Sequence, residues 1–294
     1  MNLTKDVRDQ GLDKFYTNLN VAEHCINKTN EIFPLESFDT IVEPSAGAGS
    51  FSCQIIHKNV LAMDIMPEEN SVNIITQDFL TYYPVKASSS RFLTLGNPPF
   101  GKNSSMAIKF FNHASQWSDV IAFIVPKVFR RISVQNKLNP LFHLVHDEDI
   151  PSNPCSFHPP MNVKCCFQIW KINYEGIKRP IIKLPTTHAD WKFLPFGPLD
   201  ESGQPTPPEG ADFALRAYGG KCGQIIDDIE ELKTLRPKSW HWIQCIPDQV
   251  KKDVLIQRFN TLDYSNSNNT ARQNSIGKGE LVSLYSDVFN TVLE

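Results

Sequence analysis

Four consecutive residues, Asn97-Pro98-Pro99-Phe100, place an amide, two prolines and an aromatic ring directly after an apolar run at residues 92–95. The run has the composition of a buried parallel strand. Proline has no N–H to donate to a ladder, so the strand must end here. In open α/β sheets, ligands bind at the carboxyl ends of such strands. An amide oxygen and a proline carbonyl at that edge are suited to accept hydrogen bonds from a substrate amino group; a rigid turn without a chemical role is the alternative.

A glycine-rich loop lies about fifty residues upstream and follows a second apolar strand. Its residues are, in order, Glu43, Pro44, Ser45, Ala46, Gly47, Ala48 and Gly49. Glycines allow the backbone to approach a ligand closely. The loop has no Gly-Lys-Ser/Thr and no third glycine at dinucleotide spacing, which disfavours a diphosphate ligand. The acid that precedes the loop suits a ligand with an amino group or a positive charge.

Two further acids stand where strands are expected to end. Asp64 could accept both ribose hydroxyls of an adenosine-type ligand, a geometry that dinucleotide-binding folds use. Asp78 could accept from an adenine amino group while the ring of Phe79 covers the base. The alternatives are a surface aspartate at position 64, and a helix N-cap followed by a core phenylalanine at positions 78 and 79.

In this order, the motifs resemble those of class I S-adenosylmethionine-dependent methyltransferases, and above all the amino-directed branch that contains DNA adenine-N6 methyltransferases. The segment Lys14–Asn18 is similar to the cofactor-binding element that precedes the glycine loop in that branch. The motif order is similar to that of the gamma group. The resemblance covers residues 11–172 and departs from the family at Met66, where relatives often have a second acid.

The resemblance implies S-adenosyl-L-methionine as the cofactor and no metal. The implied cofactor-binding residues are Tyr16, Thr17, Glu43, Pro44, Ser45, Ala46, Gly47, Gly49, Asp64, Ile65, Asp78, Phe79 and Asn97. The implied catalytic residues are Asn97, Pro98, Pro99 and Phe100. Asn97 and the carbonyl of Pro98 would bind the target amine, and Phe100 would stack on the target base.

The implied activity is methyl transfer to the exocyclic N6 amine of adenine in nucleic acid, with DNA ahead of RNA and the adenine flipped or unpaired. One alternative is an amino group of adenine or guanine in RNA, or a glutamine amide in a protein. Another is a non-catalytic binding module of the same fold. The intact Asn97 and the glycines at positions 47 and 49 favour an enzyme.

Strands alternate with helical stretches through the first 174 residues, which predicts a Rossmann-like, doubly wound, mostly parallel sheet with helices on both faces. The expected strands cover residues 39–43, 59–64, 72–78, 92–95, 120–125 and 163–172, and the expected helices cover 19–33, 51–56 and 106–115. We expect residues 1–174 to form the cofactor-binding catalytic domain. Residues 175–294 are rich in proline and glycine and predict a smaller, irregular α+β region, which would serve in target recognition, with its clearest helix over 227–235 and a mobile loop over 265–269.

The net charge of −3 conceals a basic region, because residues 101–192 carry 12 basic and 6 acidic side chains. Such a region attracts a phosphate backbone. The expected phosphate contacts are Lys127, Arg130, Arg131, Lys137 and Lys164, and the expected wall opposite Phe100 consists of Phe157, His158 and Phe167.

No apolar run approaches the roughly 20 residues that span a bilayer, so no membrane partner is expected. Residues 1–6 lack the apolar stretch of a secretion signal. Seven cysteines without a Cys-x-x-Cys pair predict reduced thiols in the cytoplasm or another reducing intracellular compartment.

Overall fold

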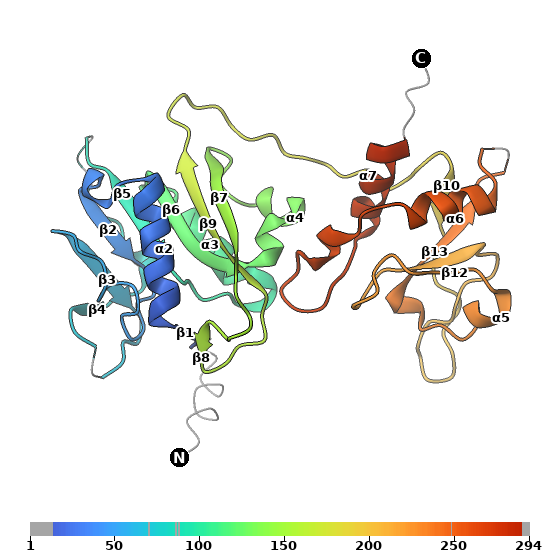
Figure 1. The fold of residues 1–294 in the computed structure, drawn as a ribbon, viewed down its shortest axis with the longest axis horizontal. Coiled ribbons are helices and arrows are strands. Elements are labelled where there is room, and N and C mark those ends of the chain that lie inside the picture. Colours follow the sequence, from blue (N-terminus) through green and yellow to red (C-terminus); the bar gives the residue numbers. More distant parts are fainter. Residues whose placement is uncertain (1–13, 70, 86, 88, 248, 290–294) are drawn as a thin grey trace. The chain divides into compact units, whose positions relative to one another are not determined.

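The computed structural model describes residues 14–69, 71–85, 87, 89–247 and 249–289. The chain forms two compact units, Met1–Ile181 and Ile182–Glu294 (Figure 1). The sequence places this boundary slightly earlier, after Tyr174. Residues 1–6, on which the expectation about secretion rests, lie outside the described residues. Within the described part of the chain, no helix is both long and apolar enough to cross a membrane.

Unit 1 is built on a seven-stranded sheet. Its strands, in spatial order, are β4 (Ile74–Thr76), β3 (Val60–Asp64), β2 (Thr40–Glu43), β5 (Phe92–Gly96), β6 (Val120–Pro126), β9 (Cys165–Ile172) and β7 (Phe142–Ile150). The first five are parallel, and β9 is antiparallel to both of its neighbours. From β2 the chain runs outward through β3 to β4 and then returns to β5 on the other side of β2. Ligands bind at the carboxyl ends of the strands where the order reverses. The topology therefore predicts a ligand site at the ends of β2 and β5.

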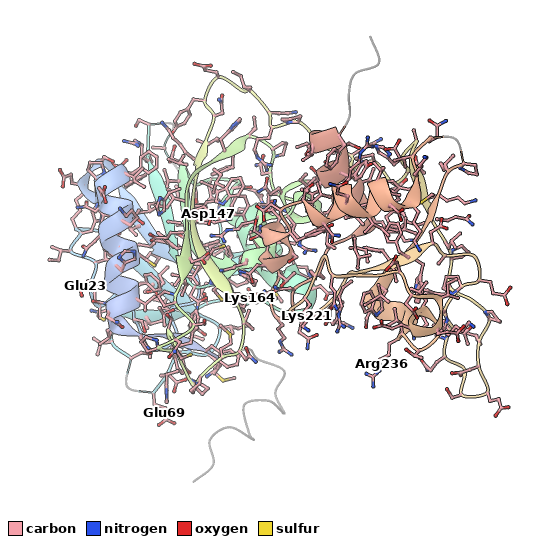
Figure 2. All side chains as sticks on the ribbon, turned by 45° about the vertical axis from the view of Figure 1, so that its right-hand side comes forward. Glu23, Glu69, Asp147, Lys164, Lys221 and Arg236 are labelled. Carbon is pink, nitrogen blue, oxygen red and sulfur yellow. The ribbon has the colours of Figure 1, made fainter. Side chains whose placement is uncertain are left out.

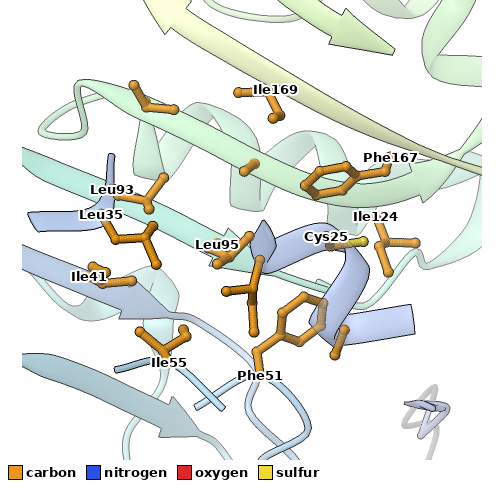
Figure 3. Close-up of a cluster of buried hydrophobic side chains, with 14 of the residues drawn as sticks. Cys25, Leu35, Ile41, Phe51, Ile55, Leu93, Leu95, Ile124, Phe167 and Ile169 are labelled. Atoms are coloured by element: carbon orange, nitrogen blue, oxygen red, sulfur yellow. The ribbon is translucent and has the colours of Figure 1, made fainter. Parts of the chain in front are cut away.

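Helices cover both faces of this sheet, α2 (Leu19–Ile32) on one and α3 (Ser105–Ala114) on the other. Successive residues of a strand point to opposite faces, so Ile41 joins the core under α2 while Val42 joins the core under α3. Figure 3 shows the first of these cores, with Cys25 of α2 among side chains from the sheet. The predicted doubly wound α/β class is confirmed.

Short elements complete unit 1. They are β1 (Tyr16–Thr17), which pairs antiparallel with β8 (Phe157–His158), the one-turn helices η1 (Leu35–Ser37), η2 (Phe79–Thr81), η3 (Lys102–Ser104) and η4 (Lys127–Arg130), and α4 (Ile132–Gln135). The pairing of β1 with β8 joins the start of the described chain to the loop between β7 and β9.

Two features of unit 1 differ from expectation. The nine-residue strand β7 was not predicted, because its polar sequence lacks the apolar run of a buried strand. The helix expected over residues 51–56 is wrong: single turns form there instead, such as the bond from the Cys53 amide to the Gly49 carbonyl at 3.0 Å. Gly47 and Gly49, which precede the segment, have positive φ of 54° and 85°, so a helix cannot extend back into the glycine loop.

Unit 2 contains a four-stranded antiparallel sheet. Its strands, in spatial order, are β10 (Trp191–Phe193), β13 (Trp240–Cys245), β11 (Phe213–Arg216) and β12 (Ile225–Ile226); its helices are α5 (Ile229–Leu232), α6 (Lys252–Asn260) and α7 (Lys278–Phe289), with turns η5 (Pro237–Ser239) and η6 (Ser265–Asn268). The core packs α6 and α7 against this sheet. The predicted helix over 227–235 is reduced to α5, and the predicted loop over 265–269 contains η6.

We expect Phe167→Ala to lower the free energy of unfolding of unit 1 by about 3–5 kcal/mol. Phe167 is fully buried on β9, and truncation would leave a cavity between the sheet and α2. Urea unfolding followed by hydrogen exchange in peptides of unit 1 would measure the effect. Ile56→Ala, at a side chain that is 96% exposed, is the control and should change little. Equal effects of the two substitutions would contradict this packing.

Candidate functional site

The loops that follow β2 and β5 touch at the point where the strand order reverses. The Ser45 hydroxyl donates to the backbone carbonyl of Asn97 at 2.9 Å. Gly96, at the end of β5, lies within contact distance of the Glu43 and Pro44 side chains and has a φ of 155°, a conformation that residues with a side chain rarely adopt. The structure therefore brings Asn97 against the glycine loop.

The side-chain amide of Asn97 has one partner and one unpaired atom. Its Nδ2 donates to the Phe15 carbonyl at 3.3 Å. Its Oδ1 is buried, and none of the described residues donates to it. A carbonyl can only accept, so the Phe15 carbonyl must face the Nδ2 side of the Asn97 amide. Oδ1 therefore points away from Phe15. An orphaned buried acceptor costs about 1–3 kcal/mol, which is consistent with a donor that binds here.

The residues after Asn97 are held by packing and by unusual backbone. Pro98 is buried, Pro99 is half-buried, and the half-buried ring of Phe100 packs against both cores of unit 1. Asn103 and Ser104 then adopt left-handed conformations, with φ of 54° and 60°. Left-handed residues other than glycine are costly and cluster at functional sites. No sequence signal used above marks these two positions.

The glycine loop is tied to the strand-end acid of β3. The Gly47 amide donates to Asp64 Oδ2 at 2.8 Å, and the Met66 amide donates to Oδ1 at 2.8 Å. A carboxylate has about four acceptor sites, so two remain for hydroxyl groups. Ile65, beside it, is 59% exposed and offers an apolar surface of the kind that covers a planar base. Asp64, Ile65 and Gly47 thus lie together, as the binding of an adenosine-type ligand would require.

Glu43 is enclosed at the end of β2, with 1% of its surface exposed. Its Oε2 accepts from the Ser52 amide at 2.9 Å. Burial raises the pKa of the Glu43 carboxyl to about 8, although hydrogen bonds from Ser52 and Phe51 act in the opposite direction. The carboxyl is therefore mostly protonated at neutral pH. A cationic ligand beside it would favour the ionised form, so the charge at this position depends on what the loop binds.

Asp78 and Phe79 match the alternative interpretation of their sequence. Asp78 caps η2, where its Oδ1 accepts from the Leu80 amide at 2.9 Å. The ring of Phe79 is 1% exposed and stacks on Phe110 with centroids 5.0 Å apart. A ring enclosed in the core cannot cover a cofactor base in this conformation. The capping bond of Asp78 uses Oδ1 alone, so it leaves the other carboxylate oxygen for an adenine amino group.

The expected wall opposite Phe100 is only partly available. Phe157 and Phe167 are buried in the core under α2, so neither is placed to receive a base. His158 is exposed on β8, directly across from Tyr16 in the register of the two short strands. The prediction named these three residues by the type of their side chains alone. Their burial distinguishes the two enclosed phenylalanines from the exposed His158.

Two of the expected phosphate contacts are ion-paired with acids of β7. Lys127 lies 2.6 Å from Asp149, and Arg130 lies 2.5 Å from Asp147 and 2.7 Å from Asp149. Figure 2 labels Asp147 on this strand. Lys127 is also buried. Because β7 was not predicted, its carboxylates were not recognised as partners for these cations.

Sequence reasoning also missed Glu68, which lies in the loop between β3 and β4. Lys14 Nζ lies 3.2 Å from its Oε1, and the Tyr16 hydroxyl donates to the same oxygen. Its amide donates to the Gly47 carbonyl at 3.4 Å. The absence of a second acid at Met66, noted in the sequence, is the one signal that could have prompted a search for an acid nearby.

The reversed strand order, the glycine loop and the partly exposed strand-end acid are features of a methyltransferase-like fold. A sequence model of the EDM2 methyltransferase-like domain matches residues 35–184, and the chain belongs to this family. The chain is 30% identical over 107 residues to the protein ENHANCED DOWNY MILDEW 2 of Arabidopsis thaliana, a match that covers 32% of this chain and 8% of that protein.

Two solved structures are also similar. One is a dimethyladenosine transferase from Plasmodium falciparum, with 16% identity and a TM-score of 0.39, covering 54% of this chain and 63% of the other. The second is the methyltransferase subunit of a type I restriction-modification system from Streptococcus thermophilus, with 17% identity and a TM-score of 0.39, covering 54% of this chain and 45% of the other.

We expect Glu43→Gln to remove a pH dependence from stability. The folded protein keeps the Glu43 proton up to about pH 8, whereas the unfolded chain releases it near the ordinary pKa of 4.5. Stability from this carboxyl is thus fully present below pH 4.5 and is lost as the pH rises towards 8. The unfolding free energy of the wild type minus that of Glu43→Gln should fall across this window and level off above it. Parallel pH profiles would contradict the assignment.

Proposed function

We propose that this chain is an S-adenosylmethionine-dependent methyltransferase that acts on an amino group, the N6 amine of adenine in nucleic acid, with DNA ahead of RNA. The observation that carries the proposal is the buried Oδ1 of Asn97, which has no hydrogen-bond partner among the described residues and is held against the glycine loop at the point where the strand order reverses. An acceptor in that place is complementary to an N–H donor.

The residues present fit the cofactor. Thr17 Oγ1 is buried without a partner among the described residues, as Asn97 Oδ1 is. Asp64 would hold the ribose, Ile65 would cover the adenine, and Gly47 would let the backbone approach the methionine part. S-adenosylmethionine supplies a methyl group on a positively charged sulfur. The ionisable Glu43 carboxyl at the base of the loop suits that charge.

The chain's own residues would orient and polarise the target amine. An exocyclic adenine nitrogen is a poor nucleophile because its lone pair is delocalised into the ring. Asn97 Oδ1 and the Pro98 carbonyl would accept its two hydrogens, which localises the lone pair, and would stabilise positive charge that develops on nitrogen. Ser45 holds the backbone carbonyl of Asn97, and the Phe15 carbonyl orients its side-chain amide, so Oδ1 would be held in place before the substrate arrives. A neutral amide is no strong base, so proton loss would follow methyl transfer.

A glutamine side-chain amide in a protein is the second candidate, and the charges favour it. Lys127 and Arg130 are ion-paired. Residues 1–181 carry 17 basic and 17 acidic side chains, and residues 182–294 carry 12 and 15. Neither unit has the basic excess typical of a nucleic-acid-binding domain. The same two acceptors would receive the N–H groups of a primary amide.

Incubation of the purified full chain with labelled S-adenosylmethionine and separate pools of DNA, RNA and protein would test the proposal. Label in DNA, recovered as N6-methyl-2′-deoxyadenosine after digestion to nucleosides, is the expected result. Label in protein would favour the second candidate. Cofactor binding without label in any pool would overturn catalysis in favour of a binding module.

We expect Asn97→Ala to abolish methyl transfer while it leaves the cofactor dissociation constant within a few-fold, because Asn97 Oδ1 would contact the target. Filter-bound radioactivity and calorimetry would give the two quantities. Asn20→Ala, at an exposed position of α2, is the matched control. Lost cofactor affinity in Asn97→Ala would reject the assignment to the target.

We expect Asp64→Ala to weaken cofactor binding by about 1–3 kcal/mol, the usual cost of orphaned hydrogen-bond partners. The substitution would remove the acceptor for ribose and would also release the Gly47 amide. Calorimetry against Glu23→Ala, an exposed acid of α2 (Figure 2), would isolate the effect. An unchanged dissociation constant would show that the ribose lies elsewhere.

A further inference from the structure

Residues 14–17 form a strap that contacts the glycine loop. The ring of Tyr16 lies against Gly47, where an added Cβ would be 2.8 Å from Cε1 of the ring. The Tyr16 ring therefore occupies the space that a side chain at residue 47 would fill. The pairing of β1 with β8 anchors the strap beyond this point. Asn18 adds a second anchor, because its backbone amide donates to the Ser156 carbonyl at 2.9 Å.

The other end of the strap is fastened by Glu68. This single carboxylate accepts from the Tyr16 hydroxyl and pairs with Lys14 at 3.2 Å, and Lys14 Nζ also lies 3.4 Å from the Met66 carbonyl. Burial and the Glu68 carboxylate raise the pKa of Tyr16, so its hydroxyl remains a donor. The Ser71 hydroxyl and amide both donate to the Glu68 carbonyl, at 2.7 and 3.0 Å, which holds the residue in place.

The same strap also reaches the amide at the end of β5. Phe15, between the two residues that Glu68 binds, accepts the hydrogen bond from Asn97 Nδ2. Movement of the strap away from Gly47 would therefore also remove the group that orients Asn97. The strap thus connects the loop proposed for the cofactor with the acceptor proposed for the target.

We propose that Glu68 is a positioning residue that latches the strap over the glycine loop, retains the cofactor product and keeps the Asn97 amide oriented. The inference rests on the proposed function, because it assigns the retained ligand as S-adenosylmethionine and its demethylated product. Glu68 itself would touch neither substrate; it would act through Tyr16, Lys14 and Phe15.

Stopped-flow dissociation of S-adenosylhomocysteine from the full chain would test the latch. Glu68→Ala should raise the dissociation rate about tenfold, as expected for loss of a charge-assisted hydrogen bond. Tyr16→Phe, which removes only the hydroxyl, should act in the same direction. The double variant should be little worse than Glu68→Ala alone, because both remove one interaction. Glu68→Gln keeps an acceptor for Tyr16 and should recover most of the effect.

Glu69→Gln is the matched control, since Glu69 is the adjacent, exposed acid labelled in Figure 2. It should leave the rate unchanged. Amide hydrogen exchange of residues 14–18 without ligand should be faster in Glu68→Ala than in wild type. Unchanged dissociation and exchange, or additive effects of the two single substitutions, would overturn the latch while the wild type still binds cofactor. A wild type that binds no S-adenosyl compound would instead refute the proposed function, and this inference with it.

Discussion

The close approach of β2 and β5 at their carboxyl ends is the constraint on which the site depends. Gly96 supports it, because this residue has a φ of 155°, a backbone conformation that residues with a side chain rarely adopt. Once the two ends are in contact, the Ser45 hydroxyl can bond to the carbonyl of Asn97, and the acceptor amide becomes part of the same structure as the glycine loop. The topology supplies the location, and the backbone conformation at Gly96 and the Ser45 hydrogen bond hold the two loops together.

Burial then gives two acids of the same neighbourhood different properties. Glu43 is enclosed, so desolvation dominates and its carboxyl holds a proton near neutral pH. Asp64 is partly exposed, and its two carboxylate oxygens accept from the amides of Gly47 and Met66. The two residues follow neighbouring strands and look alike in sequence. Their different environments would let one respond to the charge of a ligand while the other presents fixed acceptors.

The parallel strands of unit 1 could be predicted because burial on both faces requires continuous apolar runs, as in Val120–Pro126. The edge strand β7 could not, since only its two end residues, Phe142 and Ile150, are buried and five of its nine residues are His, Asp or Glu. Phe79 shows a second limit: an acid followed by an aromatic describes a binding pair and a capped core residue equally well, and the packing against Phe110 distinguishes them. The proximity of Asn97 to the glycine loop followed from strand order, which the motif series anticipated.

Contacts between distant parts of the chain complete the site, and local sequence carries no trace of them. Asn97 is oriented by a carbonyl 82 residues earlier, and Glu68 is engaged by residues 52 and 54 positions before it. A backbone carbonyl has the same chemistry whatever its side chain, so no substitution at Phe15 would reveal this contact directly. The orientation of the amide therefore depends on the path of the strap, and the strap depends on the side chains of Lys14, Tyr16 and Glu68. In the proposed function, a neutral acceptor held in this way would select its target by hydrogen-bond geometry, so a unit with balanced charge could still discriminate among amines.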